Sequence, residues 1–115
     1  MLKLARAIAA ACLITAVAGC TAPQHPAAPA MPNTVAVKHS AFTPATLTVP
    51  VGTTVTWHFA DRFPHSVQGV GPNAQAINSP IIDRGTWTYT FTTRGEYHYT
   101  CQLHPDMTGT IIVRN

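Results

Sequence analysis

The residues with the clearest chemistry lie near the C-terminus, where Cys101, His104 and Met107 follow one another at three-residue intervals. A second histidine, His65, lies far upstream of this group. Thiolate and thioether ligands favour Cu(I), whereas imidazole accepts both oxidation states of copper. One cysteine, two histidines and a weak axial methionine form the ligand set of a type 1 (blue) copper site. The four residues are therefore the candidate ligands of a single copper ion.

Each of these residues also has an ordinary structural interpretation. A lone cysteine at the end of a strand is usually a buried apolar residue, and a lone histidine usually lies at the surface. Methionine is a poor ligand for zinc, which disfavours a structural zinc site. The other histidines of the folded part, at positions 39, 58 and 98, are expected at the surface, since two alternate with apolar positions and one follows a lysine.

The elements that must position these side chains are expected to be β-strands. Apolar and polar residues alternate with a period of two, many of them β-branched or aromatic, and glycines and prolines interrupt the runs. This pattern predicts strands with one buried face, and several short strands in one small domain suggest a β-sandwich. The expected strands are 34–38, 45–49, 53–59, 86–92, 96–101 and 108–113, with a further strand starting at His65 and a loop at 71–80.

The strand at 96–101 decides where the thiol points. Tyr97, Tyr99 and Cys101 share one face of that strand, so the cysteine is expected to point inward. His104 and Met107 are then expected on a loop that folds back over the metal.

The N-terminus carries a targeting signal. Lys3 and Arg6 precede an apolar run at 7–18, which is too short to span a bilayer as a helix. Residues 17–20 (VAGC) resemble the lipobox of bacterial lipoproteins, in which the cysteine is acylated. We therefore expect a lipoprotein signal peptide at 1–19, lipidation of Cys20, and a tether rich in proline and alanine at 20–33. The protein is expected to be exported and lipid-anchored, facing the periplasm or the cell exterior.

Composition excludes several classes of function. The 115 residues leave room for one small domain, and the net charge of +3 owes much to the targeting segment. No cluster of Lys and Arg remains to suggest nucleic-acid binding. A single cysteine in the folded part rules out an internal disulfide framework.

The stretch 95–109 (GEYHYTCQLHPDMTG) resembles the C-terminal copper loop of the cupredoxins, with a Cys-x-x-His-x-x-Met spacing similar to that of the amicyanin branch. Residues 55–67 resemble the first-histidine region of that family. The resemblance implies a cupredoxin domain at 34–115, folded as an all-β Greek-key β-sandwich of about seven to eight strands. It implies His65, Cys101 and His104 as equatorial ligands and Met107 as the axial one. Ser66 replaces the asparagine of many members, so we expect a looser tie between the two ligand loops.

These features predict a membrane-tethered carrier of single electrons that uses one Cu ion, and not an enzyme. An edge of His104 should be exposed within an apolar rim formed by Leu103, Pro105 and Pro64. A redox partner protein would dock there transiently, and the chain is expected to be a monomer. There is no second cysteine near Cys101 for a dinuclear copper centre. The alternative is a copper-binding or copper-delivery lipoprotein, although such a role favours exposed Met and His ligands, and methionine is scarce here.

Overall fold

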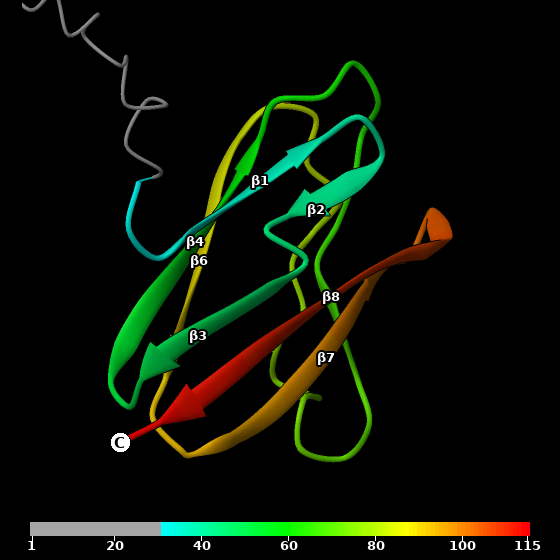
Figure 1. Cartoon of the computed structure of the whole chain (residues 1–115). Helices are drawn as coiled ribbons and strands as arrows, with labels where there is room; N and C mark the ends of the chain where they lie inside the picture. The colour runs from blue at the N-terminus through cyan, green and yellow to red at the C-terminus, as the bar shows by residue number, and fades with distance from the viewer. Residues whose placement is uncertain (1–30) are drawn as a thin grey trace, which may run out of the picture.

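The structure, a computed structural model, describes residues 31–115. This part of the chain forms eight β-strands in two four-stranded sheets that pack face to face (Figure 1). Among the described residues, no helix is long and apolar enough to cross a membrane. The all-β sandwich prediction is confirmed. The predicted signal peptide (1–19), Cys20 and residues 21–30 of the predicted tether lie outside the described residues.

Each sheet combines parallel and antiparallel neighbours. The first sheet has the order β2-β1-β4-β6 and contains β2 (Ala41–Thr43), β1 (Thr34–Lys38), β4 (Thr53–Phe59) and β6 (Gly85–Phe91). The second has the order β3-β8-β7-β5 and contains β3 (Thr46–Pro50), β8 (His104–Arg114), β7 (Gly95–Cys101) and β5 (Gln68–Val70). Strands β1 and β4 are parallel, as are β3 and β8, and the remaining pairs are antiparallel.

The core lies between the sheets and follows the predicted alternation. In β4 the side chains of Val55, Trp57 and Phe59 are buried, while those of β7 alternate so that Tyr97, Tyr99 and Cys101 face inward. The ring of Tyr99 packs edge-on against Trp57, with 5.5 Å between the ring centroids. Burial of these large apolar side chains is the main favourable contribution to the folding free energy. Cys101 is thereby fixed at the end of a strand whose inner face belongs to the core.

The last strand begins earlier than predicted. Strand β8 starts at His104, so His104 and Met107 lie on a strand and not on a loop. A two-residue turn joins β7 to β8, and Cys101 pairs with His104 across it. Pro105 is tolerated in this strand because β3 pairs with β8 only from Thr110 onward, so the first part of β8 has β7 as its sheet neighbour.

Two further elements differ from the sequence prediction. Strands β2 and β5 have three residues each, and neither was predicted with these bounds. The strand expected to start at His65 starts at Gln68, and His65 itself forms an isolated antiparallel bridge with Ile82. The predicted loop at 71–80 contains no named strand, as expected. This loop packs closely against β5. A Cβ built at Gly69 would lie only 1.8 Å from the carbonyl oxygen of Ala74, so the approach requires glycine at this position.

Candidate metal centre

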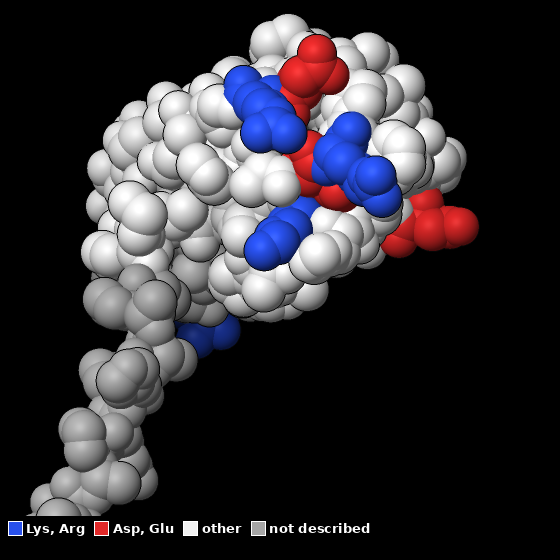
Figure 2. Space-filling model, turned by 90° about the horizontal axis from the view of Figure 1, so that it is seen from above, with Lys and Arg blue, Asp and Glu red and all other residues white. Residues whose placement is uncertain are grey.

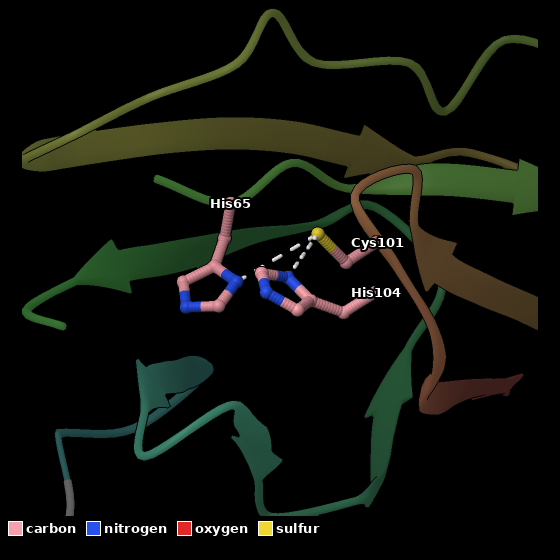
Figure 3. A group of neighbouring side chains, drawn as sticks. All are labelled: His65, Cys101 and His104. Atoms are coloured by element: carbon pink, nitrogen blue, oxygen red, sulfur yellow. Dashed lines mark hydrogen bonds between the residues drawn. The ribbon is translucent and has the colours of Figure 1, made fainter. Parts of the chain in front are cut away.

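Three of the four predicted ligands converge at one end of the sandwich (Figure 3). Cys101 ends β7 and His104 begins β8, and the register between these strands shifts at Cys101. His65 comes from the connection between β4 and β5. Two backbone hydrogen bonds to Ile82 hold it there, one donated by the His65 N–H (3.1 Å) and one by the Ile82 N–H (2.8 Å). Pairing between β7 and β8 therefore positions Cys101 and His104, and the isolated bridge to Ile82 positions His65.

The donor atoms lie close enough to share one ion. The Cys101 Sγ is 3.7 Å from Nδ1 of His65 and 3.6 Å from Nδ1 of His104. One ligand atom from each residue lies within 4.8 Å of the others. Both imidazoles therefore present Nδ1 to the thiol. Cys101 and His65 are 0% and 1% exposed, while His104 is half-buried.

Met107, the fourth predicted ligand, is buried on β8 three residues after His104. The two side chains line the same hollow of about 370 Å³, together with Leu103, Pro105 and Ser40. The role of Met107 as the axial ligand stays a prediction. Leu103 and Pro105 are both exposed, as expected for a rim around His104.

The surroundings of Cys101 favour the thiolate. Burial by itself raises the pKa of the Cys101 thiol, but hydrogen bonds from His104, the Ser66 amide, His65 and the Leu103 amide outweigh it and lower the pKa to about 6. The Ser66 amide lies 3.4 Å from the sulfur. Because the thiolate is the form that binds metals, the folded chain offers this ligand in its competent state near neutral pH.

Ser66 ties the two ligand segments together, and the expectation that this tie is looser than one made by asparagine stays a prediction. Its Oγ accepts a hydrogen bond from the Gln102 N–H at 3.0 Å, while its own N–H points to the Cys101 sulfur. The segment that carries His65 is thus tied to the turn between Cys101 and His104 by both the backbone and the side chain of one buried residue. A short side chain suffices because the two segments lie in direct contact.

Asp61 is a part of the centre that the sequence analysis did not identify. Its Oδ2 lies 2.8 Å from Nε2 of His65, the ring nitrogen that faces away from the thiol. Hydrogen bonds from the Ser40 amide, from His65 and from the Arg62 amide lower the pKa of Asp61 to about 2, against a smaller opposing effect of burial. Asp61 lies only four residues before His65, on the same connection between β4 and β5. An aspartate in a polar loop nevertheless carries no sequence signal for such a role, because the path of this loop decides whether its carboxylate reaches the ring.

The other histidines of residues 31–115 do not belong to the cluster. His39, His58 and His98 are exposed, as predicted, and His98 pairs with Glu96 at 3.2 Å. Within residues 31–115, the group formed by His65, Cys101 and His104 is the one set of three or more His, Cys, Asp or Glu side chains arranged to hold a metal ion.

The donor set fits a type 1 copper ion. It combines one buried thiol that ionises readily, two imidazoles presenting the same ring nitrogen, and a buried thioether nearby. Soft sulfur donors together with imidazole suit copper in both of its common oxidation states. The buried, hydrogen-bonded surroundings hold these donors in one arrangement, which limits how far the site must reorganise when its charge changes.

Comparisons with known proteins agree with this chemistry. The chain matches the cupredoxin-like domain family over residues 8–113. It is 37% identical over 70 residues to amicyanin from Paracoccus denitrificans and 36% identical over 84 residues to chloroplastic plastocyanin from Tetradesmus obliquus. These matches cover 58% and 64% of this chain, but only 53% and 58% of the two relatives, so the chain spans little more than half of their length.

A solved structure extends the likeness to the whole fold. The structure of a purple cupredoxin from Nitrosopumilus maritimus superposes with a TM-score of 0.66 at 30% sequence identity, covering 70% of this chain and 98% of that protein. The shared portion is thus nearly all of the neighbour's chain. The resemblance identified from the copper-ligand motif is confirmed, and this chain belongs to the cupredoxin-like domain family.

Proposed function

We propose that this protein is a carrier of single electrons, without catalytic activity of its own. One copper ion would be held by Sγ of Cys101, by Nδ1 of His65 and His104, and more weakly by the thioether of Met107. The observation that carries the proposal is the convergence of three buried or half-buried donor atoms within 4.8 Å. Bound copper would supply one-electron redox chemistry through its Cu(I) and Cu(II) states.

The chain's own residues would hold the donors still while the charge of the site changes. The Ser66 amide stabilises the sulfur, the bridge to Ile82 fixes His65, and the β7–β8 pairing fixes Cys101 relative to His104. None of these contacts has to break when one electron is added or removed. This supports rapid transfer, because little structural rearrangement accompanies it.

His104 is the ligand through which electrons would enter and leave. It is half-buried, whereas His65 and Cys101 are 1% and 0% exposed. The exposed Leu103 and Pro105 flank it and provide an apolar rim for a transient redox partner. Figure 2, which views the upper end of Figure 1, shows acidic and basic side chains interspersed without a large area of one sign.

Copper delivery is the alternative role, and ligand burial argues against it. A delivery protein must hand its metal to another ligand, which requires access to the donor atoms. Here Cys101 and His65 lie inside the sandwich, and an incoming ligand would reach the metal only beside His104. Burial of these two ligands therefore supports a copper ion that stays bound as a cofactor over one that is passed to another protein.

We also propose that the domain is exported and held at the cell membrane by lipid on Cys20, facing the periplasm or the cell exterior. The lipobox-like residues 17–20 and the apolar run before them support this. A single acyl chain binds membranes only marginally, at about 10⁴ M⁻¹, so stable anchoring requires the several chains of a lipoprotein. The segment 21–33, rich in proline and alanine, would act as a semi-rigid tether.

Copper loading of the purified protein tests the carrier function. We expect one Cu(II) per chain and an intense visible absorption from charge transfer between the Cys101 thiolate and copper. Cys101→Ser should remove this absorption, while the matched change of an exposed histidine, His98→Gln, should preserve it. A loaded protein without the strong band, or one that cannot be reduced and reoxidised reversibly, would contradict the proposal.

Mass spectrometry of the mature protein from bacterial membranes tests the anchor. We expect the mature chain to begin at Cys20 with acyl groups attached, and Cys20→Ala to leave the precursor unprocessed or to release the protein. A mature N-terminus at any other residue would rule out lipidation at this position.

A further inference from the structure

His65 uses both of its ring nitrogens. Nδ1 faces the thiol of Cys101 at 3.7 Å, and Nε2 lies 2.8 Å from Oδ2 of Asp61. The side chains of His65 and Asp61 are only 1% and 8% exposed, so water competes little for this contact. A carboxylate can only accept at this nitrogen, so Nε2 carries the proton and Nδ1 presents its lone pair toward the metal position.

Asp61 is itself fixed by the backbone on both of its oxygens. The Ser40 N–H donates to the same Oδ2 at 2.8 Å, and the Arg62 N–H donates to Oδ1 at 2.7 Å. Ser40 belongs to the turn between β1 and β2, where it has a positive φ of 54°. Two backbone N–H groups therefore set the orientation of the carboxylate, and that carboxylate sets the orientation of the His65 ring.

We propose that Asp61 is a positioning residue that fixes the tautomer of His65 and lowers the reduction potential of the copper site. The inference rests on the proposed function, in which copper cycles between Cu(I) and Cu(II). It assigns the tuning of the site to a residue that touches no metal. It also links a copper ligand to a surface turn through a single side chain.

The physical reason is that a carboxylate hydrogen-bonded to a ligand imidazole changes how that imidazole binds the metal. A carboxylate that accepts the N–H of a metal-bound imidazole raises the basicity of the other nitrogen and fixes the ring, and removing such a partner typically costs 10–100-fold in metal affinity. The more highly charged Cu(II) gains more from a richer donor and from a nearby negative charge than Cu(I) does. Asp61 therefore favours the oxidised state, and a neutral replacement should shift the balance toward the reduced one.

The test compares two substitutions that remove one negative charge each. Asp61→Asn keeps the size of the side chain and an oxygen that can accept, whereas Asp83→Asn removes an exposed charge that follows Ile82, the bridge partner of His65. Voltammetry of the copper-loaded protein should show a rise of about tenfold or more in the Cu(I)/Cu(II) ratio at fixed potential for Asp61→Asn, which equals about 59 mV for one electron. Asp83→Asn should shift the ratio by less than a third as much.

Equal shifts in the two variants, or no shift in Asp61→Asn, would overturn the proposal. A second measurement, which requires neither a variant nor copper, is ¹⁵N NMR of the His65 ring in the metal-free wild-type protein. We expect a proton on Nε2 and none on Nδ1, and the opposite tautomer would refute the role of Asp61 even if the variant failed to fold. Because this readout uses no copper, it separates an error about Asp61 from an error about the proposed function.

Discussion

Replacing Ser66 with alanine isolates one hydrogen bond that joins the two ligand-bearing segments. The Ser66 side chain is 0% exposed, and its Oγ accepts the Gln102 N–H at 3.0 Å, within the usual range for such bonds. Alanine keeps the Cβ and the backbone amide that contacts Cys101, so it removes little besides this acceptor.

The expected cost follows from what happens to the Gln102 amide. A typical intramolecular hydrogen bond contributes about 0.5–1.5 kcal/mol, and a buried donor left without a partner costs about 1–3 kcal/mol. The bond is only partly buried and Gln102 is exposed, so water can reach the freed N–H in part. We therefore expect Ser66→Ala to lower the free energy of unfolding by about 1–2 kcal/mol, or roughly tenfold in the folding equilibrium.

Urea unfolding of the metal-free protein measures this loss, with hydrogen exchange of the Gln102 amide as the local readout. Ser40→Ala is the matched control, because the Ser40 side chain is exposed and its amide, which contacts Asp61, is retained. The exchange of the Gln102 amide should accelerate in Ser66→Ala alone. If both variants unfold at the wild-type urea concentration and the Gln102 amide exchanges at its original rate, the tie through Ser66 Oγ does not exist in solution.

Three further predictions address other parts of the molecule. Gly109→Ala should destabilise the protein by about 1–3 kcal/mol in urea, because the new Cβ would lie 2.3 Å from Cζ of Tyr99, and an unchanged midpoint would show that the ring does not cover this glycine. The carboxylate of Asp61 stabilises the metal-free fold above its ordinary pKa of 3.8, and this contribution should disappear as the pH falls through its folded pKa of about 2. Acid titration of Asp61→Asn should therefore show a flatter loss of stability over that interval, and identical curves would contradict the pKa shift. Met107→Leu should keep copper and colour but raise the reduction potential, as measured by voltammetry, since the axial thioether is a weak donor; loss of the metal would identify Met107 as a principal ligand.

The faces of the long strands could be predicted because their sequences alternate without interruption. In β4 and β7 each second residue is apolar or aromatic, and those residues are the buried ones. The three-residue strands β2 and β5 are too short to display a period. The start of β8 was obscured by Pro105, whose effect depends on which neighbouring strand is present at that point of the sheet.

The metal ligands could be predicted from the sequence, whereas the residues that hydrogen-bond to them could not. Cysteine, histidine and methionine have distinctive donor atoms, so their spacing at 101, 104 and 107 is informative by itself. Asp61 and Ser66 are common polar residues whose roles depend on contacts of about 3 Å, one within the loop that precedes His65 and one between segments remote in sequence. The length of the Ser66 side chain does not by itself reveal this bond, since only the structure shows how closely the Gln102 amide approaches it.

The complete burial of Cys101 has a consequence for the chain before it acquires copper. A thiol with a pKa of about 6 is largely ionised near neutral pH, and such thiolates react readily with peroxides and disulfides when they are accessible. With 0% of Cys101 exposed, these oxidants gain access only when the sandwich opens, so the lifetime of the reduced thiol follows the frequency of opening. A substitution far from the metal centre that makes opening more frequent would therefore shorten the time during which newly folded, copper-free protein remains able to be loaded.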